Sequence, residues 1–230
     1  MKLPDKSTSL EAAVARIPDG ATVLVGGFGV PGTPFSLIRE LQRQGQKDLT
    51  LVKNDANEAG MGIDHLLASG QVKKLIVTHL GLNANAIAMM NDARLEVEFC
   101  AQGILAERIR AGGAGIPAIL TDIGIGTELA LGKQVVEMNG KPLLVEPALR
   151  ADVALIHADR ADPFGNLAYA ATARNFNPPM AMAATIVIAE AERLLPLGDL
   201  SPEEVETPGA FVDQVVELPE ISEDYGVVRR

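Results

Sequence analysis

The sequence predicts an α/β protein with an open, mostly parallel sheet and flanking helices. Short apolar segments rich in Val, Leu and Ile alternate with amphipathic stretches, which is the pattern of repeated strand–helix units. The chain has 230 residues, of which 47% are hydrophobic and only 3% aromatic. A core of aliphatic side chains is typical of buried parallel strands. The length fits one large domain, which we expect over residues 1–218, followed by an acidic tail over residues 219–230.

The N-terminal elements are bounded by turn and cap residues. A short helical stretch runs from Ser9 to Arg16, and Pro18-Asp19-Gly20 forms a turn. A buried strand is expected over 22–25, followed by a glycine-rich segment over 26–32 that we call the glycine loop. Pro34 suits the first turn of a helix that runs to about residue 44, where Gly45 ends it.

Further strand and helix signals follow in alternation. Strands are expected over 49–52, 74–78 and 95–99, and helices over 63–68, 84–91 and 104–110, the last ending at Gly112-Gly113. The pattern then changes. Apolar runs over 135–138 and 143–145 flank Asn139-Gly140, which predicts a hairpin with a type I′ turn. Two more strands are expected over 153–156 and 184–188.

Composition argues against several classes of function. The net charge of −10 disfavours binding to nucleic acid or to an anionic membrane. An anionic small ligand stays possible, because backbone N–H groups can bind it on an acidic protein. Cys100, the only cysteine, is interpreted as a buried apolar residue in a reducing compartment. The first 20 residues lack the apolar core of a signal peptide, and the longest apolar run, over 180–189, is shorter than the ~20 residues of a membrane span. We expect a cytoplasmic protein.

Metal and serine-hydrolase chemistry are also disfavoured. His65, His79 and His157 are scattered without metal-ligand spacing, so no metal site is expected. A Gly-x-Ser-x-Gly nucleophile motif is absent from the sequence.

The glycine loop allows two functional interpretations and one structural one. Residues 27–32 match the dinucleotide pattern G-x-G-x-x-G, which would make the protein an NAD(P)-dependent oxidoreductase. Against this, Pro31 has no N–H to offer a pyrophosphate, and Lys53 ends the second strand where an acidic ribose ligand is expected. Asp55 lies close to that position but past the strand end. The loop can also be a tight turn without a ligand.

A broader pattern resembles the alpha subunits of family I CoA transferases, in several blocks along nearly the whole chain. The blocks comprise Asp19-Gly20, the glycine loop with its sequence Gly26-Gly27-Phe28-Gly29-Val30-Pro31-Gly32, Leu49-Thr50, Asn54, Gln102-Gly103, residues 105–115, Glu146, residues 149–152, Asp162, Gly165-Asn166, residues 173–177 and Thr207-Pro208-Gly209. The nearest resemblance is to transferases of the 3-oxoacid, acetate or butyrate type. The fold that this implies for residues 1–218 is a CoA transferase alpha domain.

The resemblance also implies a reaction and a partner. Such enzymes move CoA between two carboxylic acids by ping-pong chemistry through a glutamyl-CoA thioester, with CoA as cosubstrate and no tightly bound cofactor. The nucleophilic glutamate lies in a Ser-Glu-Asn-Gly motif of the beta subunit, and this chain contains only Ser222-Glu223 followed by Asp224. A beta-type partner is therefore expected, in a heterotetramer of two alpha and two beta subunits. A CoA-ester-binding protein without catalysis is a third possibility.

Two amide side chains are the candidate catalytic residues. By resemblance, Asn54 donates to the oxyanion of the tetrahedral species, and Gln102 points at the catalytic glutamate or the acyl group. Both follow strand ends, where open α/β sheets place their sites. Each also has a structural alternative: an Asx turn for Asn54 and a helix-start position for Gln102. The seven residues of the glycine loop, Gly26 to Gly32, are the candidate CoA-binding segment, because glycines let pantetheine or the acyl group approach the backbone.

Three arginines have roles that the sequence does not separate. Arg108 and Arg110 face different directions on one predicted helix, and a solvated helix face is the favoured interpretation for them, with anion binding as the alternative. Arg174, followed by Asn175, either positions a substrate carboxylate or ties a loop. The acid pair that the enzyme uses is not predicted.

Overall fold

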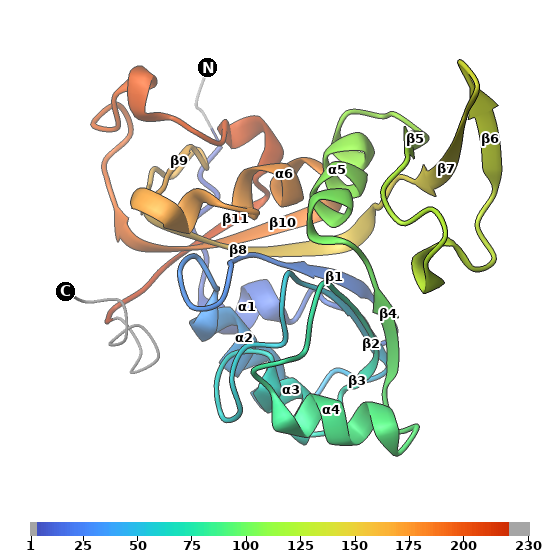
Figure 1. Cartoon of the computed structure of the whole chain (residues 1–230). Coiled ribbons are helices and arrows are strands. Elements are labelled where there is room, and N and C mark those ends of the chain that lie inside the picture. The colour runs from blue at the N-terminus through green and yellow to red at the C-terminus, as the bar shows by residue number, and fades with distance from the viewer. Residues whose placement is uncertain (1–3, 221–230) are drawn as a thin grey trace.

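The fold is built on an eight-stranded, mostly parallel sheet. A computed structural model describes residues 4–220 and shows this sheet at the centre of the molecule (Figure 1). Its strand order is β11-β10-β8-β1-β2-β3-β4, with β9 (Leu167–Ala168) paired antiparallel to β8. The parallel strands are β1 (Thr22–Val25), β2 (Leu49–Val52), β3 (Val72–Val77), β4 (Glu96–Phe99), β8 (Ala151–Ala161), β10 (Ala184–Leu194) and β11 (Gln214–Glu217).

Helices cover both faces of this sheet. One face carries α1 (Leu10–Val14), α2 (Phe35–Gln44), α3 (Asp64–Ala68) and α4 (Ala84–Asn91), and the other carries α5 (Gln102–Gly113) and α6 (Asn177–Met182) (Figure 1). Strand alternation divides the core accordingly. In β1, Val23 and Val25 join the cluster beneath α1–α4, whereas Leu24 joins the cluster beneath α5 and α6. The predicted α/β class with a mostly parallel sheet is therefore confirmed.

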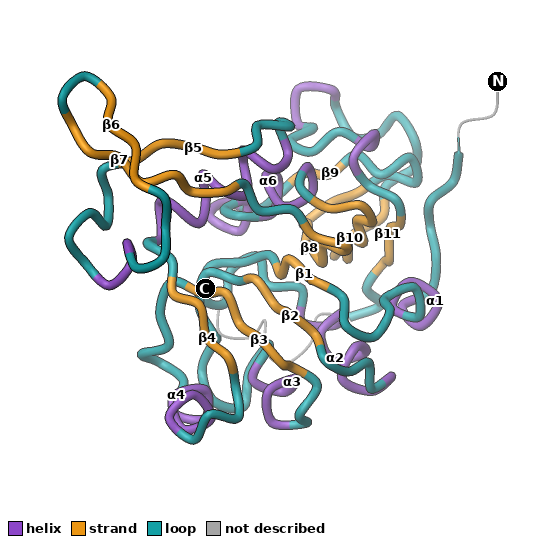
Figure 2. The backbone as a smooth tube through the Cα atoms, turned by 90° about the vertical axis from the view of Figure 1, so that its right-hand side faces the viewer, coloured by secondary structure: helices purple, strands orange, loops and turns teal. Residues whose placement is uncertain are grey.

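A second, three-stranded sheet forms an arm. It consists of β5 (Ala118–Thr121), β7 (Lys141–Pro147) and β6 (Val135–Met138), all antiparallel, and it projects from the α5 side of the main sheet (Figures 1 and 2). The predicted hairpin is the β6–β7 pair. Asn139 and Gly140 have φ values of 52° and 73°, and positive φ at both central residues is the geometry of a type I′ turn.

Several elements differ from the sequence-based expectation. β5, β9, β11 and α6 were not predicted, and β8 and β10 are longer than expected. The apolar run over 180–189 contains the end of α6 and the start of β10, so its hydrophobicity does not mark the boundary between them. α5 begins at Gln102 rather than residue 104, and Pro34 caps α2 rather than lying within it. Most of the predicted acidic tail, residues 221–230, lies outside the described residues.

The topology fixes where a site can form. β1 lies at the centre; the chain places β2, β3 and β4 on one side of it and β8, β10 and β11 on the other. In open parallel sheets, ligands bind at the carboxyl ends of the strands near such a reversal of strand order. The segments that follow β1, β2, β3 and β4 are therefore the candidates.

Candidate functional site

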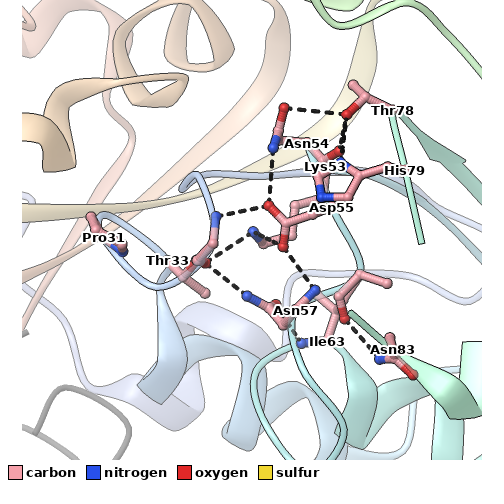
Figure 3. Close-up of polar contacts among 12 residues, drawn as sticks. Pro31, Thr33, Lys53, Asn54, Asp55, Asn57, Ile63, Thr78, His79 and Asn83 are labelled. Carbon is pink, nitrogen blue, oxygen red and sulfur yellow. Dashed lines mark hydrogen bonds and ion pairs between the residues drawn. The ribbon is translucent and has the colours of Figure 1, made fainter. Parts of the chain in front are cut away.

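Side chains from four neighbouring strand ends lie close together at the carboxyl edge of the sheet. The glycine loop follows β1, Lys53 to Asn57 follow β2, Thr78 follows β3, and Gln102 follows β4 at the start of α5. Figure 3 shows the glycine loop facing the residues after β2, with Thr78 on the far side of Asn54. The two candidate catalytic residues therefore share one site.

Asn54 and Gln102 contact each other directly. The Gln102 Nε2 donates to Asn54 Oδ1 at 2.7 Å, and the Asn54 Nδ2 donates to Asp55 Oδ2 at 3.1 Å. Thr78 holds the backbone of Asn54, because its hydroxyl donates to the Asn54 carbonyl at 2.7 Å. Asn54 is fully buried, at 0% exposure, whereas Gln102 is exposed. Of the two amides, Gln102 is the one that a ligand reaches from solvent in this conformation of the chain.

Asp55 is the buried carboxylate of the site. Its Oδ2 accepts from Gly29 N at 2.7 Å as well as from Asn54, and its Oδ1 accepts from Asn57 N at 2.8 Å. The Lys53 ammonium lies 3.6 Å from Oδ1. Burial alone would raise the pKa of Asp55, but the Lys53 charge and these N–H donors outweigh it and lower the pKa below its usual value. The carboxylate is therefore ionised at neutral pH.

The backbone N–H and the backbone carbonyl of Gly29 are both hydrogen-bonded. While its N–H donates to Asp55, its carbonyl accepts from Thr33 Oγ1 and from Asn57 Nδ2, both at 2.8 Å, and from Lys53 Nζ at 3.4 Å. Figure 3 shows these donors converging below the loop. Gly29 has φ +60°, and nothing lies within 4 Å of a Cβ built on it. The backbone at the loop tip is thus held by hydrogen bonds from both sides, and the Cβ position of Gly29 is open.

The other glycines of the loop are required by contacts within the chain. A Cβ on Gly26 would lie 1.9 Å from the Asn177 side chain, one on Gly27 2.2 Å from Thr33 Oγ1, and one on Gly32 2.3 Å from the Ala173 carbonyl. Gly29 is therefore the one glycine of the loop with open space at the Cβ position, whereas the other three are close to atoms of this chain.

A shallow pocket lies beside the loop tip. It has a volume of about 390 Å³ and is lined by Phe28, Pro31, Thr172 and Asn175. Phe28 is 47% exposed, so an aromatic face is presented to solvent there. Asn175 supports the pocket, because its Nδ2 donates to the Pro31 carbonyl at 2.9 Å. The lining is mostly apolar, as is usual for sites that bind the organic part of a ligand.

The N-terminus of α2 already holds a carboxylate. Glu190 of β10 is fully buried, and its Oε2 accepts from Leu37 N in the first turn of α2 at 2.9 Å. In dinucleotide-binding folds this helix end receives the pyrophosphate. The buried Glu190 side chain occupies that position and uses one of the N–H donors that a phosphate would need. The geometry therefore disfavours the oxidoreductase alternative.

Glu190 also binds His157 of β8. Nδ1 of His157 lies 3.0 Å from Glu190 Oε1, and Nε2 lies 3.3 Å from Glu192 Oε1. Burial alone would lower the pKa of His157, but the hydrogen bonds and charges of the two glutamates raise it from 6.5 to about 9. The protonated imidazole therefore stabilises this part of the sheet at neutral pH.

We expect the free energy of unfolding to fall as pH rises from 6.5 to about 9. A raised folded-state pKa gives a contribution that is complete below the unfolded pKa and is lost as pH rises through the folded one. The loss amounts to roughly 3 kcal/mol at about 1.4 kcal/mol per pKa unit. Denaturant titrations of wild type and His157→Gln test this: the variant should lack that part of the pH dependence, and His79→Gln, at an exposed position, should keep it. Parallel pH curves for wild type and His157→Gln would contradict the assignment.

The three arginines have structural partners. Arg108 is buried, and it donates to the Pro147 carbonyl at 2.9 Å and to Glu98 at 3.1 Å, so the expected solvated face is wrong for this residue. Arg110 is exposed and pairs with Glu107, as expected for a solvated face. Arg174 pairs with Glu206 at 3.0 Å, which favours the loop-tying interpretation.

Two general findings concern metals and membranes. Among residues 4–220, no group of three or more His, Cys, Asp or Glu side chains is arranged to hold a metal ion. Within the same part of the chain, no helix combines the length and apolar character that crossing a bilayer requires.

Cys100 is buried, as predicted, and burial raises the pKa of its thiol.

Comparison with known proteins identifies the family. Residues 7–218 match the family profile described as coenzyme A transferase. The chain is 49% identical over 212 residues to the probable coenzyme A transferase alpha subunit of Bacillus subtilis (strain 168), a match that covers 92% of this chain and 93% of that one. It is 46% identical over 212 residues to one subunit of the succinyl-CoA:3-ketoacid coenzyme A transferase of Xanthomonas campestris pv. campestris, covering 92% and 86%.

A solved structure extends the likeness to the fold. A variant of the decarboxylase AibA/AibB superposes with a TM-score of 0.81 and 32% identity, covering 95% of this chain and 84% of that chain. The profile match and the sequence identities each extend over most of the chain. The chain therefore belongs to the coenzyme A transferase family.

Proposed function

We propose that this chain is the alpha-type subunit of a heteromeric CoA transferase. It moves CoA between an acyl-CoA and a small carboxylic acid of the 3-oxoacid, acetate or butyrate type, with CoA as cosubstrate and no tightly bound cofactor. Its partner is a beta-type subunit, in a heterotetramer of two alpha and two beta subunits, and the enzyme acts in the cytoplasm. Family membership and the subunit names of the matched relatives support this assignment.

The main support for the proposal is the set of polar side chains at the carboxyl edge of the sheet. Two neutral amides, Asn54 and Gln102, are joined there, and the carboxylate beside them, Asp55, is buried with both oxygens hydrogen-bonded. Neutral donors suit a developing oxyanion. A buried, fully bonded carboxylate does not suit attack on a thioester. The arrangement fits one half of an active site whose nucleophile comes from another chain.

In the proposed reaction, the glutamate carboxylate of the partner attacks the acyl-CoA carbonyl and the CoA thiolate leaves. The thiolate then attacks the glutamyl carbonyl, which gives the glutamyl-CoA thioester and releases the first acid. The incoming carboxylate reverses these steps and takes the CoA. Each tetrahedral species carries an oxyanion, and Gln102 and Asn54 are the groups of this chain that stabilise or position it.

The glycine loop is the proposed CoA-binding segment. Its tip at Gly29 is open, and the adjoining pocket lined by Phe28 and Pro31 offers an apolar path of about 390 Å³. The pantetheine part of CoA, which is mostly apolar with amide groups, suits such a lining.

The three-stranded arm is the proposed contact with the partner subunit. Apolar side chains in the arm and its connecting segments are exposed, among them Ile123, Leu131 and Val135, and exposed apolar surface of this kind supports contact with another chain.

A trapping experiment tests this division of roles. The complex is incubated with acyl-CoA and no acceptor acid, and intact-mass spectrometry is recorded for each subunit. The partner should gain the mass of CoA less one water, as a glutamyl thioester requires, and this chain should gain no mass, because the nucleophile is not in this chain. CoA bound covalently to this chain would contradict the proposal. Release of CO₂ without exchange of CoA would instead favour decarboxylase chemistry, the activity named for the AibA/AibB relative.

A further inference from the structure

The Asp55 carboxylate lies at the centre of the polar network beneath the glycine loop (Figure 3). It contacts the loop through Gly29 and the candidate catalytic amides through Asn54. Asp55 is only 4% exposed, so it does not meet a substrate directly in this conformation. Its contacts nevertheless determine what the exposed part of the site can do.

An ionised carboxylate accepts hydrogen bonds and donates none. The amide of Asn54 can in principle be oriented in two ways, with nitrogen and oxygen exchanged. Next to Asp55 Oδ2, at 3.1 Å, only the nitrogen makes a favourable contact, because two oxygens would repel each other. Asp55 therefore directs the Asn54 oxygen to the opposite side, toward α5.

The orientation of Asn54 in turn fixes Gln102. Since Asn54 presents Oδ1 at 2.7 Å, Gln102 must present Nε2 to it. One N–H of Gln102 is thereby used, and its second N–H and its Oε1 remain on the exposed side of the residue. A charge that is buried below the loop thus decides which atoms of Gln102 a substrate meets.

The same carboxylate links these amides to the glycine loop. Gly29 N donates to Asp55 Oδ2 at 2.7 Å, the oxygen that also accepts from Asn54. Lys53, with 0% exposure, lies within 3.6 Å of the other oxygen and within 3.4 Å of the Gly29 carbonyl. The Lys53 charge keeps the pKa of Asp55 low against the effect of burial. Burial lowers the pKa of Lys53 itself, and the charge of Asp55 opposes that shift. The centre of the network is acceptor-only while Asp55 is ionised.

We propose that Asp55, paired with Lys53, is a positioning residue for the transfer reaction: it sets the orientation of the Asn54 and Gln102 amides and aligns them with the tip of the glycine loop. Its effect on catalysis rests on the function proposed above. Its effect on the amide orientation rests on the contacts within this chain alone. Asp55 acts through Gln102 and is itself not a contact of the substrate.

The substitution Asp55→Asn tests this proposal, because it keeps the shape of the side chain at position 55 and removes its negative charge. The new amide prefers to turn its oxygen toward the Lys53 ammonium, which leaves its NH₂ facing the N–H donors of Gly29 and Asn54. Asn54 and then Gln102 must rotate to avoid this contact. We expect kcat of the assembled enzyme to fall about 10–100-fold, by analogy with the loss caused by removing groups that orient metal ligands, with little change in KM.

Asp64→Asn is the matched control. Asp64 is another buried carboxylate, and it accepts from Gly60 N at 2.6 Å and from the Nδ2 groups of Asn83 and Asn85 at 2.9 Å and 3.1 Å. It has no contact with Asn54 or Gln102 in the described structure. This variant should lose stability while kcat stays near that of wild type. Equal losses of kcat in the two variants would show a general cost of removing a buried charge and would overturn the proposal.

A double-mutant cycle separates positioning from a structural effect. In a Gln102→Ala background only the effect of Asp55 on Asn54 remains, so Asp55→Asn should lower kcat by a clearly smaller factor than in the wild-type background. An equal loss of kcat in both backgrounds would mean that Asp55 does not act through the Gln102 amide, and the proposal would fail.

A second readout needs no turnover. In the isolated chain with ¹⁵N-labelled glutamine, the Gln102 side-chain amide should exchange its bonded proton slowly in wild type and Asp64→Asn, and faster in Asp55→Asn. Unchanged exchange in Asp55→Asn would also overturn the proposal. A wild-type complex that exchanges no CoA would instead contradict the proposed function, and the amide spectra would still decide whether Asp55 orients Gln102.

Discussion

We expect the replacement of Asn54 by alanine in the assembled complex to lower kcat by about 10²–10³-fold, the usual loss when one donor to an oxyanion is removed. The variant lacks the Asn54 amide, whose Nδ2 donates to Asp55 at 3.1 Å and whose Oδ1 holds Gln102 at 2.7 Å. KM should change little, because these interactions strengthen mainly in the transition state. Steady-state kinetics of the wild-type and Asn54→Ala complexes check this result.

The kinetic test of Asn54→Ala needs a control variant for lost folding stability. Asn54 is fully buried, and its loss removes one of the donors to Asp55 and the acceptor of Gln102 Nε2, which costs about 1–3 kcal/mol of folding free energy. Asn83→Ala is the matched variant, because Asn83 is equally buried and its Nδ2 donates to the Ala56 carbonyl and to Asp64. It should lose similar stability and keep kcat within a few-fold of wild type. A near-normal kcat for Asn54→Ala, measured below the melting temperature of both variants, would remove Asn54 from the site.

Much of the fold could be predicted from the sequence, because each buried strand is a short apolar run between turn residues. Residues 22–25 and 49–52 were predicted with the bounds that β1 and β2 have in the structure. Local signals also identified the hairpin, since Asn139-Gly140 adopts the positive φ values that its turn type needs. β11 was missed because only Val215 and Val216 of its four residues are apolar, a weaker signal than the three apolar residues in each of β1 and β2.

Arg108 shows why helix faces are harder to predict. Spacing along α5 separates Arg108 from Arg110, but it does not tell which side meets the solvent. That depends on the end of β7, whose Pro147 carbonyl accepts from Arg108, and on Glu98 of β4. Both partners come near Arg108 only when the sheet and the arm have formed, so no local pattern could reveal them.

The candidate site was found in part. Asn54 and Gln102 could be singled out because both follow strand ends, and the structure brings them within hydrogen-bond distance. Lys53 and Asp55 carried a signal as well, a cation and a carboxylate two positions apart after a buried strand, but their meaning depends on Gly29. The contact of Gly29 N with Asp55 joins residues 26 positions apart, and it requires a left-handed backbone at Gly29 that a motif does not specify.

The central claim is that this chain supplies one half of an active site, and reconstitution tests it most directly. The chain is assayed alone and after mixing with a beta-type subunit that carries the Ser-Glu-Asn-Gly motif, with acyl-CoA and a small carboxylic acid as substrates. We predict no CoA transfer by the chain alone, and transfer that rises with added partner until the two are present in equal amounts. Sustained CoA transfer by the isolated chain would contradict the account.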